Sequence, residues 1–306
     1  MLNLPPGPLT GLISTILLGL NIFFWAMILY FFTIFKIILP FKPVRKIIDP
    51  ILHRIAENWI TGNSGWMRLT QKAVWDVRGV EGLRHDGWYL VNSNHQSWAD
   101  IFVLQHVLNH KIPFMKILTK QALLYVPLMG LAWWALDFPF LRRYSREYLK
   151  KHPGMRGKDL EATRKACQKF TLTPTSVMNF LEGTRFTKEK HAKQNPPYRY
   201  LLNPKAGGFA LLLNTMGQKF RSMLNITIVY PDVVPNFWDF LCGRMKKVIV
   251  RVEQISIPEY FIHGDYEEDP AYRESIQQWV HQLWIAKDDL IDQLLAGSNT
   301  IATSNG

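Results

Sequence analysis

The stretch WYLVNSNHQSWADIFVLQHVL, residues 88–108, sets out a strand, a polar turn and a helix in immediate succession. Short apolar runs that suit strands recur along the chain and alternate with longer helical patterns. The strand-like runs are residues 88–91, 114–118, 136–141, 176–181, 226–230 and 248–252, and the helical runs are 99–108, 121–134, 159–170, 205–216 and 270–295. This alternation predicts an α/β fold with a mixed, largely parallel sheet flanked by helices.

The N-terminal segment is apolar, because the first charged residue of the chain is Lys36 and residues 9–35 are rich in Leu, Ile and Phe. A helix of this length measures about 40 Å, which is enough to cross the ~30 Å hydrocarbon core of a bilayer with some tilt. A basic cluster follows directly and predicts that the rest of the chain lies on the cytoplasmic side. Gly19 and Asn21 leave a second arrangement open, in which two interfacial helices enter one leaflet without crossing it.

The chain therefore divides into a membrane anchor (residues 1–43), a helical connector (44–76), an α/β domain (77–262) and a C-terminal amphipathic helix with a polar tail (263–306). The net charge is +12, and all of it is carried by residues after the apolar stem. Because the stem is apolar, this basic surface favours an anionic membrane over nucleic acid as partner. The two cysteines, Cys167 and Cys242, lie far apart in the sequence and predict neither a disulfide framework nor a metal site.

His95 and Asp100 lie in the polar turn after the first strand of the α/β domain. In an open α/β sheet, ligands bind at such strand ends. Asp100 has two interpretations: it could cap the following helix, since Ser97 precedes it by three residues, or it could orient an imidazole that accepts a hydroxyl proton. The sequence has no Gly-x-Ser-x-Gly motif, so the nucleophile of the second interpretation would be a substrate alcohol.

A second polar turn, Glu182-Gly183-Thr184-Arg185, follows another predicted strand. Glycine permits a tight backbone turn, and arginine can bind a phosphate through two parallel hydrogen bonds. The alternative is an ordinary surface turn with a Glu–Arg ion pair. His106 and His110 have the spacing of a metal-binding pair, yet neither an intervening glutamate nor a third ligand accompanies them, so packing or surface histidines are the better interpretation.

The two turns, taken together and in this order, resemble the first and third signature blocks of the glycerolipid acyltransferase family, which includes 1-acylglycerol-3-phosphate acyltransferases. Residues 138–143 resemble the second block, in which Arg143 matches the family's arginine and Arg142 replaces a frequent aspartate. Val229-Tyr230-Pro231 is similar to the fourth block. Phe186 and Thr187 after the arginine resemble a subgroup with several bacterial inner-membrane members.

The resemblance implies that His95 is the general base and Asp100 orients it. It further implies that Arg143 and Arg185 hold the acceptor's phosphate, that Glu182, Gly183 and Thr184 shape the headgroup site, and that Pro231 helps close it. A fatty acyl group would move from acyl-CoA or acyl-carrier protein to the free sn-2 hydroxyl of 1-acylglycerol-3-phosphate, with no metal or other cofactor.

The expected location is the inner membrane, with the catalytic domain facing the cytoplasm. Two other functions are considered: the same chemistry on another lysophospholipid such as lysophosphatidylglycerol, and a non-catalytic, membrane-tethered binder of anionic lipid. The binder gives no reason for His95, Asp100 and Arg185 each to lie at a strand end.

Overall fold

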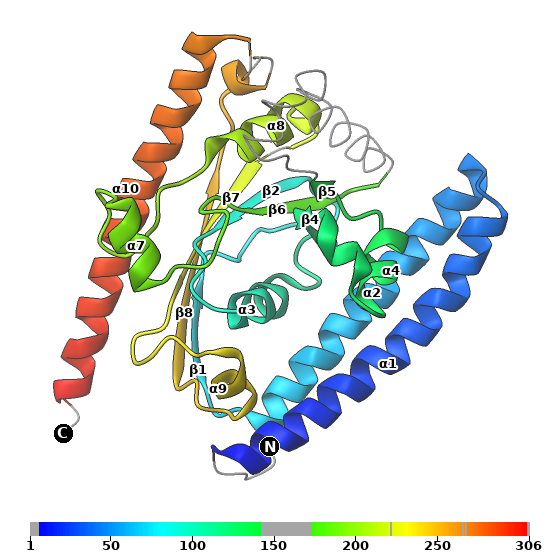
Figure 1. Ribbon diagram of the computed structural model, residues 1–306, viewed down its shortest axis with the longest axis horizontal. Helices are drawn as coiled ribbons and strands as arrows, with labels where there is room; N and C mark the ends of the chain where they lie inside the picture. The colour runs from blue at the N-terminus through cyan, green and yellow to red at the C-terminus, as the bar shows by residue number, and fades with distance from the viewer. Residues whose placement is uncertain are drawn as a thin grey trace.

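The computed structural model describes residues 6–141, 173–220, 222–262, 264, 266 and 268–304. The predicted helix 159–170, Arg143 and Cys167 lie outside these residues. A six-stranded sheet forms the centre of the fold, with helices on both of its faces (Figure 1). The predicted fold class is therefore confirmed.

The six strands lie in the order β1-β8-β7-β2-β6-β3. All neighbouring pairs are parallel except β7 and β8, which are antiparallel. The strand bounds are β1 Val74–Arg78, β2 Tyr89–Ser93, β3 Met115–Ile117, β6 Ser176–Phe180, β7 Ser222–Val229 and β8 Lys247–Ile255. Because β2, β6 and β7 are parallel neighbours, their carboxyl ends meet at one edge of the sheet, where the turn after β2 and the turn after β6 lie next to each other.

Successive side chains of a strand point to opposite faces of the sheet, so the strands contribute to two hydrophobic cores. Val91 of β2 faces a core shared with α3 (Ala99–Leu108) and α9 (Phe237–Leu241), whereas Leu90 faces a core shared with α8 (Ala206–Met216) and α10 (Pro270–Ser304). Every residue of β2 is buried. Burial on both faces explains why this strand appears in the sequence as a continuous apolar run.

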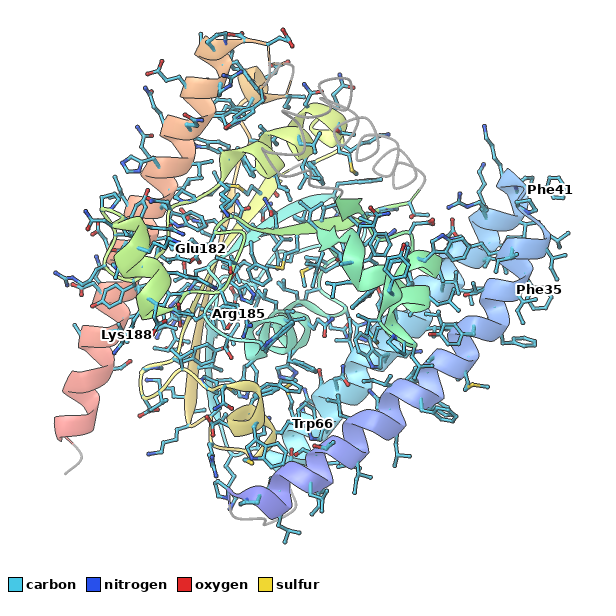
Figure 2. All side chains as sticks on the ribbon, viewed as in Figure 1. Phe35, Phe41, Trp66, Glu182, Arg185 and Lys188 are labelled. Carbon is cyan, nitrogen blue, oxygen red and sulfur yellow. The ribbon has the colours of Figure 1, made fainter. Side chains whose placement is uncertain are left out.

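Two long helices, α1 (Pro8–Ile38) and α2 (Lys42–Thr70), pack against each other as a hairpin beside this body (Figure 1). In the described part of the chain, α1 is the one helix long and apolar enough to cross a membrane. One side of α1 packs on the body, with Leu18 and Leu29 buried, and the other side is exposed. Phe35 and Phe41 project away from the body (Figure 2).

Buried ion pairs hold the end of α1 to the body. The Lys36 ammonium lies 2.6 Å from Asp137 Oδ2 and 3.0 Å from Asp49 Oδ1. Arg45 of α2 lies 2.7 Å from the same oxygen of Asp137 and 3.2 Å from Asp49 Oδ2. Burial is the main reason that the pKa of nearby Lys116 falls to about 8. We call Lys36, Arg45, Asp49 and Asp137 the hairpin cluster.

Two predicted elements are wrong. The predicted helix 121–134 is a short 3₁₀ turn, η1 (Gln121–Tyr125), followed by α4 (Met129–Ala135), since Pro127 lacks an amide hydrogen and Leu128 has a φ of 62°. The predicted strand 136–141 is reduced to β5 (Phe140–Leu141), because Asp137 has a φ of 54°. Among the described residues, β5 pairs with β4 (Thr119–Lys120) and does not join the central sheet.

Three further differences concern the start of one strand, the end of one helix and two helices that were not predicted. The first strand, β1, begins within the segment predicted as connector. The C-terminal helix α10 continues to Ser304, into the segment predicted as a polar tail. The sequence patterns also missed two short helices, α7 (Lys188–Gln194) and α9.

Candidate active site

Asn94 fixes the turn between β2 and α3 to the neighbouring strand. Its side-chain amide donates to the Ile228 carbonyl at 2.8 Å, and its Oδ1 accepts from the Ile228 amide at 2.9 Å. The side chain therefore extends the β2–β7 ladder by a pair of backbone-like hydrogen bonds. The next residue, His95, leaves the strand end with a fixed backbone direction.

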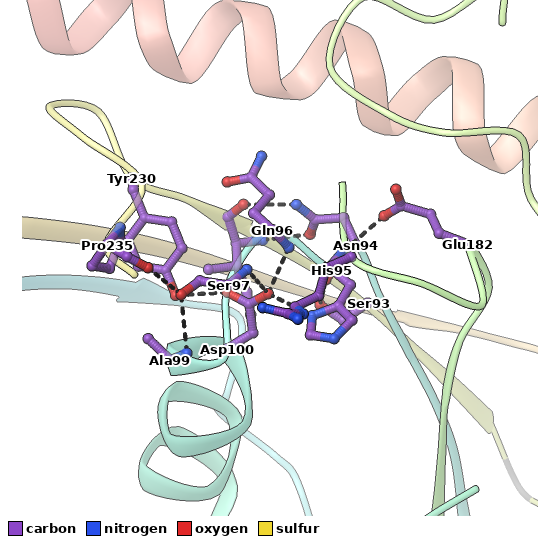
Figure 3. Close-up of polar contacts among 12 residues, drawn as sticks. Ser93, Asn94, His95, Gln96, Ser97, Ala99, Asp100, Glu182, Tyr230 and Pro235 are labelled. Atoms are coloured by element: carbon purple, nitrogen blue, oxygen red, sulfur yellow. Dashed lines mark hydrogen bonds and ion pairs between the residues drawn. The ribbon is translucent and has the colours of Figure 1, made fainter. Parts of the chain in front are cut away.

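His95 and Asp100 form a hydrogen-bonded pair, with 2.8 Å between His95 Nδ1 and Asp100 Oδ2 (Figure 3). The same Oδ2 accepts from the amides of Gln96 at 2.6 Å and Ser97 at 2.8 Å. The contacts of both sequence interpretations of Asp100 occur together, because one carboxylate accepts from the free amides before α3 and also contacts the imidazole; the catalytic role of the pair stays a prediction.

The pair fixes the orientation of the imidazole. Since Nδ1 faces a carboxylate, the neutral ring carries its hydrogen on Nδ1 and leaves Nε2 with a lone pair. Within the described part of the chain, no group hydrogen-bonds to Nε2. The ring stacks on Phe180 at 3.9 Å between centroids, and its side chain is 12% exposed. These contacts hold the ring in place and leave Nε2 available to accept a proton.

Tyr230 is a member of the site that the sequence analysis did not assign. It follows β7, and its hydroxyl donates to Asp100 Oδ1 at 2.7 Å. Burial, together with the nearby Asp100 charge and this hydrogen bond, raises the pKa of Tyr230 well above its usual range, so the hydroxyl keeps its proton. Pro231 comes directly after it and is half-buried. The following loop contacts the turn between β2 and α3, because Ser97 Oγ donates to the Pro235 carbonyl.

Glu182 lies beneath the His95 turn and is fully buried. Its two oxygens accept from the backbone amides of His95 at 2.8 Å and Leu202 at 3.1 Å. Burial is the main cause that raises the pKa of Glu182 to about 8, against the lowering effect of these two hydrogen bonds. This carboxyl therefore links the backbone at His95 to the backbone at Leu202.

Gly183 and Thr184 shape the second turn. Gly183 has a φ of 67°, a left-handed conformation that glycine adopts without strain. The Lys190 ammonium donates to Thr184 Oγ1 at 2.8 Å and to the Arg185 carbonyl at 2.9 Å. The turn is joined to the first turn by the Phe186 amide, which donates to the His95 carbonyl at 2.7 Å.

Arg185 is exposed, and its guanidinium carbon lies 4.7 Å from the centre of the Trp98 ring. No carboxylate of the described residues forms an ion pair with it, so the alternative of a Glu182–Arg185 surface pair is wrong. Glu182 and Arg185 lie toward the same side of the sheet as α7 (Figure 2). Among the described residues, no group accepts a hydrogen bond from the guanidinium N–H groups.

The structure thus brings together His95, Asp100, Glu182 and Arg185 at one edge of the sheet. It does not bring His106 and His110 together as a metal pair. His106 packs on the Trp75 ring, and burial lowers its pKa, whereas His110 Nε2 lies 2.9 Å from Thr61 Oγ1. No cluster of three metal-binding side chains occurs among the described residues.

The site thus combines a strand-end histidine that is hydrogen-bonded to a carboxylate with an arginine on the adjacent turn. The model of the Acyltransferase family matches residues 74–233, more than half of the chain, and the protein belongs to this family.

Similar proteins are 1-acyl-sn-glycerol-3-phosphate acyltransferases. The gamma form of Mus musculus is 26% identical over 186 residues, which are 57% of this chain and 44% of that protein. Form 3 of Arabidopsis thaliana is 25% identical over 217 residues, which are 67% of this chain and 53% of that protein. The chain thus spans about half the length of these relatives. The crystal structure of the 1-acyl-sn-glycerophosphate acyltransferase PlsC from Thermotoga maritima aligns with 89% of this chain and 97% of its own, at 19% identity and a TM-score of 0.44.

Proposed function

We propose that the protein transfers a fatty acyl group from acyl-CoA or acyl-carrier protein to the free sn-2 hydroxyl of 1-acylglycerol-3-phosphate, which yields phosphatidic acid. The observation that carries this proposal is the His95–Asp100 pair at a strand end, with Arg185 on the adjacent turn. The names of the similar proteins support the acceptor, and the family supports the reaction type.

In this mechanism His95 Nε2 accepts the proton of the sn-2 hydroxyl while the oxygen attacks the thioester carbonyl of the donor. The carbon–sulfur bond then breaks, and the thiolate leaves and takes the proton from the imidazolium. Asp100 holds the ring orientation and stabilises the imidazolium, and the Tyr230 hydroxyl and two backbone amides hold Asp100. All steps use side chains of the protein, so the proposed reaction requires no metal or other cofactor.

The acceptor's phosphate binds at Arg185 in this proposal, because the guanidinium is exposed and has no carboxylate partner in the described chain. Arg143 remains a proposed second phosphate contact from the segment outside the described residues. Thr184 and Pro231 lie on the turns that flank the site and remain proposed headgroup contacts.

The hairpin supports attachment to one leaflet rather than a crossing. Charged side chains of α2, including Arg45, Asp49 and Glu57, lie along the helix that packs against α1. Carrying these charges through the hydrocarbon core with α1 is costly. We infer that the exposed apolar side of α1 enters the cytoplasmic leaflet of the inner membrane while α2 stays with the catalytic body.

A panel assay tests the catalytic proposal. Purified full-length protein is given lysophosphatidate, lysophosphatidylglycerol or monoacylglycerol in mixed vesicles, each with acyl-CoA or acyl-carrier protein as donor. We expect phosphatidic acid from the first acceptor at the highest kcat/KM. Faster turnover of lysophosphatidylglycerol would contradict the proposed acceptor, and binding of lipid without transfer to any acceptor would support the non-catalytic binder.

A flotation assay tests the membrane proposal. Phe24→Ser and Phe31→Ser alter exposed side chains of α1 and leave its packed side unchanged. Together they should reduce the fraction of protein that floats with anionic vesicles, and Val74→Ser, an exposed position on β1, serves as control. Unchanged flotation of the α1 variant would contradict insertion of this face.

A further inference from the structure

Trp98 and Arg185 contact each other across the two turns of the active site. The Arg185 guanidinium carbon lies 4.7 Å from the centre of the Trp98 ring, within the range of a cation–π interaction. Trp98 is 48% exposed and stands three residues after His95, at the N-terminal cap of α3. The contact therefore joins the catalytic turn to the turn that carries the arginine.

An aromatic ring holds a guanidinium differently from a carboxylate. A carboxylate accepts hydrogen bonds from the guanidinium fork and neutralises its charge, which leaves less of both for a ligand. A ring face attracts the cation through its quadrupole and accepts no conventional hydrogen bond. Arg185 held by Trp98 thus keeps a full positive charge and N–H donors for a phosphate.

Both backbones are already fixed where the two side chains begin. Beside Trp98, the Ala99 amide donates to Ser97 Oγ at 3.1 Å, and that hydroxyl contacts the Pro235 carbonyl. Beside Arg185, its own carbonyl accepts from Lys190 at 2.9 Å. Among the described residues, the Trp98 ring is the one contact of the Arg185 side chain, so we expect this ring to set the position of the guanidinium.

We propose that Trp98 is a positioning residue for the acceptor's phosphate, which holds Arg185 through a cation–π contact beside His95 without neutralising it. This inference rests on the proposed function, because it needs a phosphate-bearing acceptor at this site. It assigns an energetic role to a residue of the catalytic turn that takes no part in proton transfer.

The test compares three replacements of Trp98 in the full-length protein. Trp98→Phe keeps an aromatic face, Trp98→Leu keeps apolar bulk without one, and Trp98→Ala removes both. The Kd for lysophosphatidate is measured in mixed micelles without donor, and KM and kcat are measured with saturating acyl-CoA. We expect Leu and Ala to raise Kd and KM at least two- to fivefold with little change in kcat, and Phe to restore most of the affinity.

The same replacements are then made in the Arg185→Ala background and on monoacylglycerol, which has no phosphate. We expect neither case to respond to Trp98. Equal effects of Leu and Phe, an effect that persists without Arg185, or an equal effect on monoacylglycerol would each overturn the proposed contact. A wild type that binds lysophosphatidate but transfers no acyl group would overturn the proposed reaction, whereas the Kd series would still decide the role of Trp98.

Discussion

The proposed catalytic edge of the sheet, which carries His95, Asp100, Glu182 and Arg185, and the hairpin cluster both bury acidic side chains, but the hydrogen-bond partners of these side chains differ. Asp100 and Glu182 accept hydrogen bonds mainly from backbone amides, with a tyrosine and an imidazole added at Asp100. In the hairpin cluster, Lys36 and Arg45 pair directly with Asp49 and Asp137. Neutral donors stabilise the Asp100 carboxylate without a countercharge that would neutralise it, so its charge can act on His95. The ion pairs of the hairpin cluster neutralise these charges and attach α1 and α2 to the body.

This difference predicts that substitutions at the catalytic edge change rate and substitutions in the hairpin cluster change stability. Turnover and the free energy of unfolding, measured on the same variants, distinguish the two regions.

The largest effect is expected from His95→Ala, which removes the proposed base. Turnover of lysophosphatidate should fall by roughly 10²–10⁴-fold while the urea unfolding midpoint stays near that of the wild type. His85→Ala, which alters a half-exposed histidine paired with Glu57, is the matched control and should retain activity. A folded His95→Ala protein that transfers acyl groups at the wild-type rate would contradict the mechanism.

Lys36→Met is expected to act on stability. It leaves Asp49 and Asp137 with Arg45 as their remaining partner in the cluster, and breaking a buried ion pair costs about 3–5 kcal/mol of unfolding free energy. Lys46→Met, at an exposed position near the start of α2, should change the unfolding free energy little. Urea unfolding in detergent gives both values. A loss in kcat at unchanged stability would show that this cluster belongs to the catalytic machinery.

Tyr230→Phe is expected to have a smaller effect on stability and a measurable one on rate. It leaves Asp100 Oδ1 buried without its hydroxyl donor, at a cost of about 1–3 kcal/mol. Tyr125→Phe, at a largely exposed tyrosine, is the control. Because Oδ2 still contacts His95, turnover should fall far less than in His95→Ala. Equal losses in the two variants would mean that Tyr230 takes part in the chemistry directly.

Much of the fold follows from local patterns in the sequence. The strands β2, β6, β7 and β8 are apolar runs, and α3, α8 and α10 have helical spacing, so periodicity alone located them. The wrong assignments lie where one residue changes the backbone, as at Leu128 and Asp137 with their positive φ angles. Whether a residue adopts such an angle depends on tertiary contacts, and periodicity carries no information about them.

The residues of the candidate site also differ in whether the sequence indicated their contacts. His95 and Asp100 lie on one turn, so their spacing in the sequence indicated their contact. Tyr230 contacts Asp100 from 130 positions along the chain, and although it lies within the fourth-block resemblance, that resemblance assigned a role to Pro231 and none to the tyrosine hydroxyl. Glu182 appeared suited to a surface pair with Arg185, but the turn directs its carboxyl inward to two backbone amides. Long-range partners such as these become visible only when the sheet is assembled.

Arg185→Ala is expected to have the smallest effect on rate among the catalytic-edge variants and the most selective one. Guanidinium stays charged at any working pH and cannot act as a base, so its loss should mainly raise KM for lysophosphatidate, by about tenfold for one charge-assisted contact. Monoacylglycerol should respond much less, because it offers no phosphate.

Arg185→Lys keeps the charge without the fork and should restore part of the affinity. Lys188→Ala, an exposed cation nearby on α7, is the control for general positive charge. Some fall in kcat is compatible with a binding role, since a misplaced acceptor reacts more slowly. Equal losses on both acceptors would instead assign Arg185 a structural role and remove the support for a phosphate-bearing acceptor.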